Sequence, residues 1–256
     1  MPISPPSPVR HPVFRALIAG SLALACTQAA DGASAQQETF VGTVVYEASA
    51  GGPNADGAAM FNGMGARRET VAWGSGGRFR LETVGGMMAG TIIMTLADSA
   101  IYTLDSDART ARGVWLQSLN VEDAAPNMLA FMRERFAPPQ MERTDETASY
   151  AGHPCRMYRV VTSTMLRRGA TARACVAEDI HVRPSRYNFD WKDSAGMMAP
   201  LPLQLGVREG LPLMVEVNEN NTIVTYRAVS LTPGEPDDAL FAVPAGYSVL
   251  PREPGD

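Results

Sequence analysis

Two histidines and two cysteines lie close together in the sequence, and these residue types bind metals or carry redox chemistry. In the order H-x-C…C-x5-H they could supply four zinc ligands: His153, Cys155, Cys175 and His181. Neither half has the C-x2–4-C or H-x3–5-H spacing of common zinc sites, and a redox C-x-x-C motif is absent. A disulfide between Cys155 and Cys175 is therefore the preferred interpretation, and zinc is the alternative.

The 20-residue separation of the cysteines is compatible with a β-hairpin. If the turn is centred near Met165, Cys155 and Cys175 are directly opposed, with their Cα atoms about 4.5–5.5 Å apart and within disulfide range. A turn centred on residues 167–169 would instead place Cys155 opposite a residue beyond Cys175. The sequence leaves this register open.

The other motifs that could serve catalysis are short. Residues 73–77 (WGSGG) resemble a nucleophile elbow only in part, because G-x-S-x-G does not fit and no strand-to-helix context follows. Residues 105–107 (DSD) could begin a calcium loop, but the glycine and the distal glutamate of that motif are missing. We expect turns at both places. Glu178-Asp179 and Asp237-Asp238 could form a carboxylate pair, although solvated loops or a helix N-terminus are the simpler explanation.

The first 35 residues have the three parts of an export signal. A basic start (residues 10–15) precedes an apolar run (residues 16–26), and Ala33-Ser34-Ala35 places small residues where a signal peptidase reads them. We expect cleavage after Ala35 and a mature chain that begins at Gln36. Because an exported protein meets oxidising conditions, this expectation supports the disulfide.

Cys26 offers an alternative to cleavage at Gln36, because a cysteine at the end of an apolar run is the acceptor site of some bacterial lipoproteins. The preferred expectation is a soluble periplasmic protein whose residues 36–256 form a single domain. No later segment approaches about 18 uninterrupted apolar residues, so we expect no transmembrane segment. The formal net charge of −5 and the lack of a basic stripe argue against nucleic acid as a partner.

Alternating apolar residues separated by turn clusters predict an antiparallel sheet. The strands are expected at residues 40–48, 77–84, 91–96, 100–104, 112–116, 142–150, 155–164, 170–177, 211–217 and 222–231, the last two joined as a hairpin across residues 218–221. Residues 51–65 are rich in glycine and alanine and are expected to form a flexible loop. Residues 121–136 have acidic residues first, arginines last and one apolar face, which predicts an amphipathic helix. Residues 178–206 are predicted to form a short helix or a lid-like loop.

Four stretches in this order resemble a known family: FVGTVVYE at residues 40–47, IYTLDSDART at 101–110, YAGHPCRMYRV at 150–160 and ALFAVPAGY at 239–247. Together with the mid-chain helix they are similar to the periplasmic DUF4412-type proteins, which are related to the LolA/LolB-like lipoprotein carriers. The resemblance implies a mainly β (α+β) fold, a curved, incomplete antiparallel β-barrel with a few lid helices. Residues 121–136 and 178–206 would be those lids. The glycine-rich stretch at 51–65 and the cysteine pair are not part of the carrier pattern.

Ordinary core and loop packing is the simpler explanation of the 14 methionines, and a cavity lined by adaptable apolar side chains is the alternative that the resemblance supports. We expect an exported, non-catalytic binding protein without a cofactor, which holds an apolar ligand such as a lipid or the acyl chain of a lipoprotein. The expected cavity residues are Met94, Trp115, Met128, Leu129, Met132 and Phe136. A cell-envelope scaffold or assembly factor that binds a protein partner is the alternative. A hydrolase with a cluster of Ser, Asp or Glu around residues 178–193 is the less favoured alternative.

Overall fold

The computed structural model describes residues 39–64, 68–86, 89–95, 100–115, 139–162, 166, 169–182 and 210–250. All of them belong to one compact unit, Gln37–Asp256. The export signal, the helix expected at 121–136 and most of the lid expected at 178–206 lie outside the described residues. They stay predictions.

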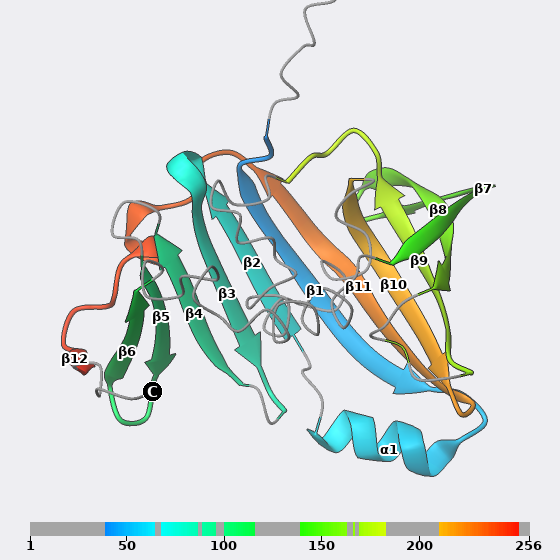
Figure 1. Ribbon diagram of the computed structural model, residues 1–256, viewed down its shortest axis with the longest axis horizontal. Helices are drawn as coiled ribbons and strands as arrows, with labels where there is room; N and C mark the ends of the chain where they lie inside the picture. Colours follow the sequence, from blue (N-terminus) through cyan, green and yellow to red (C-terminus); the bar gives the residue numbers. More distant parts are fainter. Residues whose placement is uncertain are drawn as a thin grey trace, which may run out of the picture. The chain divides into compact units, whose positions relative to one another are not determined.

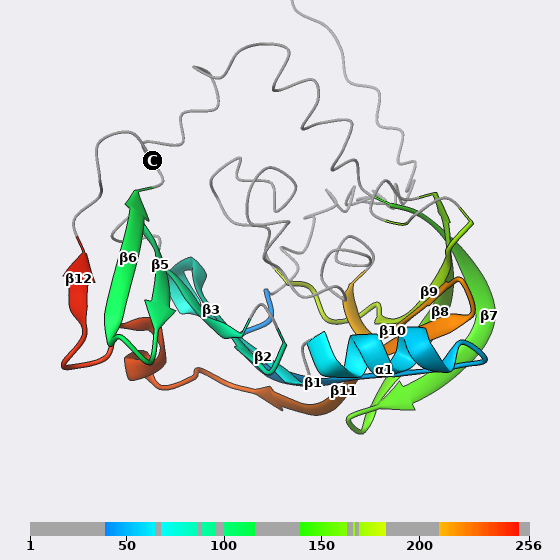
Figure 2. The same ribbon diagram turned by 90° about the horizontal axis from the view of Figure 1, so that it is seen from below.

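Within the described residues, twelve strands form one sheet in the order β12-β6-β5-β4-β3-β2-β1-β11-β10-β9-β8-β7 (Figure 1). The strands are β1 (Gly42–Gly51), β2 (Arg68–Gly74), β3 (Arg78–Val84), β4 (Gly90–Thr95), β5 (Ala100–Asp105), β6 (Thr110–Trp115), β7 (Gln140–Tyr150), β8 (His153–Thr162), β9 (Thr171–Ala177), β10 (Leu211–Glu219), β11 (Thr222–Pro233) and β12 (Ser248–Leu250). Every pairing in it is antiparallel except that of β12 with β6. The sheet is curved and its two edges, β12 and β7, do not pair with each other (Figure 2). The expected open, curved antiparallel sheet is confirmed.

The ten strands expected from the alternation pattern are all present, with ends shifted by at most three residues. The hairpin between β10 and β11 turns at Asn220 and Asn221, whose φ angles are 51° and 62°. Asparagine tolerates this left-handed conformation, and two such residues in succession suit the twist of a tight hairpin. Strands β2 and β12 were not expected from the sequence.

The prediction of a flexible loop at residues 51–65 is wrong, because most of this stretch forms helix α1 (Ala55–Met64). Asn54 caps the helix, since its side-chain oxygen accepts a 3.0 Å hydrogen bond from the N–H of Gly57. Asn62 ties the helix to the sheet by exchanging side-chain hydrogen bonds with the backbone of β1. Glycine has a low helix propensity, so the composition of this stretch concealed the helix.

The register of β1 to β5 decides which side chains share a face, because paired residues of an antiparallel ladder point to the same side. One face carries a continuous set of apolar side chains: Val44, Val71, Trp73, Phe79, Leu81, Ile92, Met94 and Ile101. On the opposite face, Ile93, Leu104 and Ala111 pack against Val243 and Tyr247 of the C-terminal segment. Figure 2 shows that segment, in orange and red, on the convex side of the curve. We therefore call the first set the concave apolar face.

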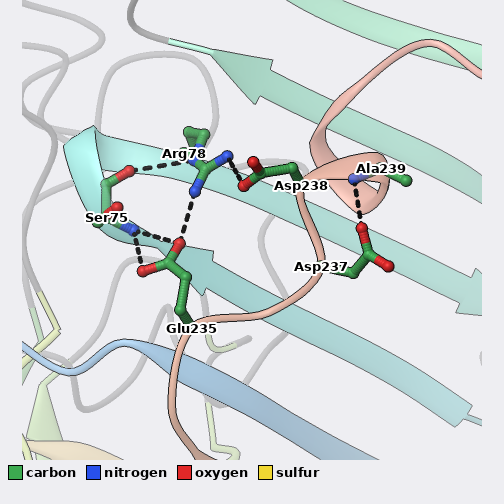
Figure 3. Close-up of polar contacts among 6 residues, drawn as sticks. All are labelled: Ser75, Arg78, Glu235, Asp237, Asp238 and Ala239. Carbon is green, nitrogen blue, oxygen red and sulfur yellow. Dashed lines mark hydrogen bonds and ion pairs between the residues drawn. The ribbon is translucent and has the colours of Figure 1, made fainter.

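Arg78, at the start of β3, holds the C-terminal segment to the sheet (Figure 3). Its guanidinium donates hydrogen bonds of 2.6 Å to Glu235 and to Asp238. It also lies over the ring of Phe241, 4.8 Å from the centroid. Glu235 in turn accepts a hydrogen bond from the backbone N–H of Ser75. These contacts join the turn between β2 and β3 to the segment that covers the convex face.

Replacing Arg78 with alanine is expected to lower the free energy of unfolding by about 1–2 kcal/mol, because two ion pairs and a ring contact are lost together. Arg159→Ala is the matched control. This strand arginine forms an exposed ion pair with Glu142, whose loss is expected to cost under about 0.5 kcal/mol. Urea denaturation of both variants measures the difference. Equal midpoints for the two variants would contradict the anchoring role of Arg78.

Candidate functional site

Cys155 in β8 and Cys175 in β9 form a disulfide, with 5.4 Å between their Cα atoms. The predicted bond is confirmed, but both predicted registers are wrong. Met157 lies opposite Cys175, so the bond runs diagonally between two positions on the same face. The turn between β8 and β9 is therefore centred one residue beyond Met165. Both cysteines belong to the main apolar core of the sheet.

The two histidines of the candidate zinc set have other partners. Nε2 of His153 lies 3.1 Å from Oδ1 of Asp179, which joins the start of β8 to the end of β9. His181 forms a parallel bridge with Thr39, and its carbonyl accepts a 2.6 Å hydrogen bond from the N–H of Phe40. Because the disulfide takes up both thiols, the alternative four-ligand zinc site is wrong.

Glu178 and Asp179 do not act as a carboxylate pair, because each is bound to a different side chain. Glu178 accepts hydrogen bonds of 2.7 and 2.9 Å from Arg143 and one of 2.6 Å from the hydroxyl of Tyr158. These bonds, above all those from Arg143, lower the pKa of Glu178 to about 2. At neutral pH it is fully ionised and unsuited to general acid–base catalysis. Asp179 is bound to His153.

The second acidic pair has structural roles as well (Figure 3). Asp237 caps a short 3-10 helix, Asp238–Phe241, by accepting a 2.9 Å hydrogen bond from the N–H of Ala239. The carboxylate of Asp238 is bound by Arg78. The expected helix N-terminus is thus confirmed for this pair.

The two remaining motifs are turns, as expected. Ser75–Gly77 form a 3-10 turn between β2 and β3 with Gly76 in the left-handed conformation, at φ 70°. Asp105 accepts hydrogen bonds from the N–H groups of Asp107 and Ala108 in the turn between β5 and β6. None of the catalytic motifs considered in the sequence therefore forms an acid–base or nucleophilic site in the described residues.

Among the six residues expected to line a cavity, the described side chain is that of Met94. It lies on the concave apolar face, 5% exposed, and in the ladder it is flanked by Phe79 of β3 and Ile101 of β5. Trp115 ends β6, but its side chain is outside the description. The other four, Met128, Leu129, Met132 and Phe136, lie outside the described residues. A cavity lined by these six stays a prediction.

The concave apolar face is most buried at its centre and more exposed toward β4 and β5. Val44 and Val71 are fully buried and Leu81 nearly so, whereas Ile92 and Ile101 are half-buried. Apolar surface therefore extends from the sealed centre of the sheet to side chains that still meet solvent. Covering such surface contributes about 25 cal/mol per Å² removed from water.

An acidic side chain lies at one end of the concave apolar face. Glu69 of β2 pairs with Tyr46 of β1 on one side and with Thr83 of β3 on the other, and it is only 8% exposed. Its Oε2 has no hydrogen-bond partner within the described part of the chain. Burial raises the pKa of Glu69 to about 7, so the neutral and ionised forms coexist near neutral pH.

Two tyrosines lie near Glu69, and a phenylalanine packs against one of them. Tyr46 is fully buried, and its hydroxyl donates a 2.8 Å hydrogen bond to the carbonyl of Pro212, so that hydroxyl hydrogen does not satisfy Glu69. Burial and the nearby charge of Glu69 raise the pKa of Tyr226 to about 12. Phe61 of α1 packs edge-on against Tyr226, with 6.4 Å between the ring centroids. Glu69 therefore has two tyrosines as neighbours.

Sequence reasoning missed Glu69, because β2 was not recognised as a strand. The available signal was the alternation within Arg68–Gly74, where Glu69, Val71 and Trp73 occupy every second position. A face that buries the tryptophan must also bury the glutamate.

No family model and no curated protein matches this chain, so the resemblance to DUF4412-type proteins stays a prediction. Similar solved structures include the LolA superfamily protein NE2245 from Nitrosomonas europaea, at 9% identity and a TM-score of 0.29, covering 81% of this chain and 91% of that one. The Pseudomonas aeruginosa MucA/MucB complex matches at 15% identity and a TM-score of 0.38, covering 83% of this chain and 58% of that one. PNGF-II matches at 11% identity and a TM-score of 0.39, and the match covers 81% of this chain but only 30% of the PNGF-II chain. At these TM-scores the similarity assigns neither family nor function.

The arrangement therefore offers an apolar surface that carries a buried acid. Among the described residues there is no helix long and apolar enough to cross a membrane.

Proposed function

We propose that this protein is an exported, non-catalytic binding protein that holds an apolar ligand, a lipid or the acyl chain of a lipoprotein, against its concave apolar face. The observation that carries the proposal is the continuity of this face, from fully buried Val44 to half-buried Ile101. The convex face of β4 to β6 already has a cover in the C-terminal segment. A ligand chain would enter at β4 and β5, where the apolar side chains are half-buried.

The partners of the acidic side chains support binding rather than catalysis. Glu178, Asp179, Asp237 and Asp238 all accept hydrogen bonds or ion pairs from the protein itself. A hydrolase of the kind considered in the sequence would need two of these acids to converge on one substrate. Because each of these acids is bound to a different group of the protein, the apolar side chains are the main contacts that the described fold offers to a ligand.

The disulfide supports an exported location. Cysteine pairs persist as disulfides in oxidising compartments such as the periplasm and are rare where thiols are kept reduced. The Cys155–Cys175 bond thus agrees with periplasmic export by a signal peptide cleaved after Ala35. Attachment of a lipid at Cys26 is the alternative, and the mass of the mature N-terminal peptide distinguishes the two.

Ile101→Glu is expected to weaken the binding of a fluorescent acyl probe about tenfold or more, because it brings a charge to the apolar surface. Val229→Glu is the matched control, since this residue of β11 is 42% exposed and is not among the side chains that form the concave apolar face. Fluorescence titration measures both affinities. Native mass spectrometry of the protein from its own periplasm is expected to show a bound lipid.

Two outcomes would contradict the proposed function. One is ligand-free protein from the native source that takes up no acyl probe, and the other is equal loss of affinity in the Ile101 and Val229 variants. A stoichiometric protein partner without lipid would favour the envelope scaffold instead.

A further inference from the structure

The concave apolar face has a polar end at Glu69. We propose that Glu69 binds the head group of the ligand, and that the ligand is an amphiphile whose head is an amine or ammonium cation. This inference rests on the proposed function, because it names the class of apolar ligand that the same face holds. It starts from a glutamate that is only 8% exposed and whose Oε2 has no hydrogen-bond partner within the described residues.

Strand alternation keeps the neighbouring arginines away from Glu69. Arg68 precedes it in β2 and pairs with Glu47 on the opposite face. Arg80 of β3 lies on that opposite face too, where its guanidinium binds Glu82. Arg68 and Arg80 therefore cannot neutralise the carboxyl of Glu69.

A buried carboxylate without a donor is unfavourable, because it has lost its hydration without a replacement. A cation that donates an N–H group supplies both the missing hydrogen bond and an opposite charge. Such charge-assisted hydrogen bonds are about twice as strong as neutral ones. An anionic head, such as that of a fatty acid, would instead place two like charges together. The site should therefore prefer cationic heads to neutral ones and neutral heads to anionic ones.

The aromatic residues near Glu69 favour the same head group. Tyr46 of β1 pairs with Glu69 itself, and Tyr226 of β11 packs against Phe61 of α1. Aromatic rings attract cations through their negative faces, most strongly where water is excluded. An acid among aromatic rings is thus suited to an ammonium group.

The distance across the face fits an amphiphile. Ile92 of β4 is two strand spacings from Glu69 and two residues further along the ladder, roughly 12 Å on a flat sheet. The acid lies at one end of this path and half-buried aliphatic side chains at the other. A dodecyl chain is long enough to span this distance with its head at Glu69.

Three probes with the same twelve-carbon chain test the head group: dodecylamine, dodecanol and dodecanoate, each below its micelle concentration. At pH 8, where Glu69 is ionised, the amine is expected to bind about tenfold or more tightly than the alcohol, and dodecanoate more weakly than both. In Glu69→Gln the three affinities should converge. Isothermal titration calorimetry measures each dissociation constant.

Glu82→Gln is the matched control, because this glutamate lies on the opposite face of β3 and should preserve the wild-type order. Equal binding of dodecanoate and dodecylamine to the wild type, or a preference that survives Glu69→Gln, overturns the head-group assignment and leaves the proposed function standing. Failure of all three probes to bind overturns the proposed function itself.

Discussion

Reducing the disulfide between Cys155 and Cys175 is expected to lower the free energy of unfolding by about 3 kcal/mol, the chain-entropy cost for a loop of this size. The bond joins residues 20 positions apart and lies in the main core. Without it, the unfolded chain regains conformations that the closed loop forbids. Guanidinium titrations with and without reductant measure the difference.

The variant Cys155→Ala/Cys175→Ala separates the bond from the reductant. Its stability should fall to that of the reduced wild type or slightly below, since smaller side chains leave a cavity, and it should not respond to reductant. Under non-reducing conditions the wild type should be lighter than its reduced form by the mass of two hydrogen atoms. Equal stability before and after reduction, or two free thiols with bound zinc, would contradict the structural role of this pair.

The sheet was predictable where alternation and turn chemistry agree. Strands such as β3 and β11 alternate apolar and polar residues between clear turns, and Asn220-Asn221 marks the hairpin before β11. The disulfide pair was predictable because a hairpin brings both cysteines within reach. Its register was not, since displacing the turn by a single residue moves the partner of Cys175 from Cys155 to Met157.

The candidate site depends on contacts that local patterns do not reveal. β2 follows directly after the glycine-rich stretch, and α1 is concealed within that stretch by its glycines. Without β2, the sequence offered no reason to place Glu69 beside Tyr46. The approach of Tyr226, more than 150 residues later, depends on the pairing of β1 with β11. Such long-range pairing follows from the whole sheet rather than from any one segment.

Stability is expected to fall as the pH rises from about 4.5 to 7, because burial raises the pKa of Glu69 from 4.5 to about 7. In this window the folded chain keeps a proton on Glu69 that the unfolded chain has released, so higher pH favours unfolding. The shift corresponds to a loss of roughly 3 kcal/mol, complete above pH 7. Glu69→Gln removes this dependence, so the variant should be more stable than the wild type at pH 8 and similar to it at pH 4.5.

The difference between the two pH profiles isolates Glu69 from the other titrating groups. Glu178 has a lowered pKa, so its contribution is lost only as the pH falls below 4.5, outside the window. Tyr226, with a pKa near 12, titrates far above it. Parallel profiles for wild type and Glu69→Gln between pH 4.5 and 8 would show that Glu69 is not held in a desolvated site. If the head-group proposal holds, saturating dodecylamine should flatten the wild-type profile as well, because a bound cation stabilises the ionised carboxylate.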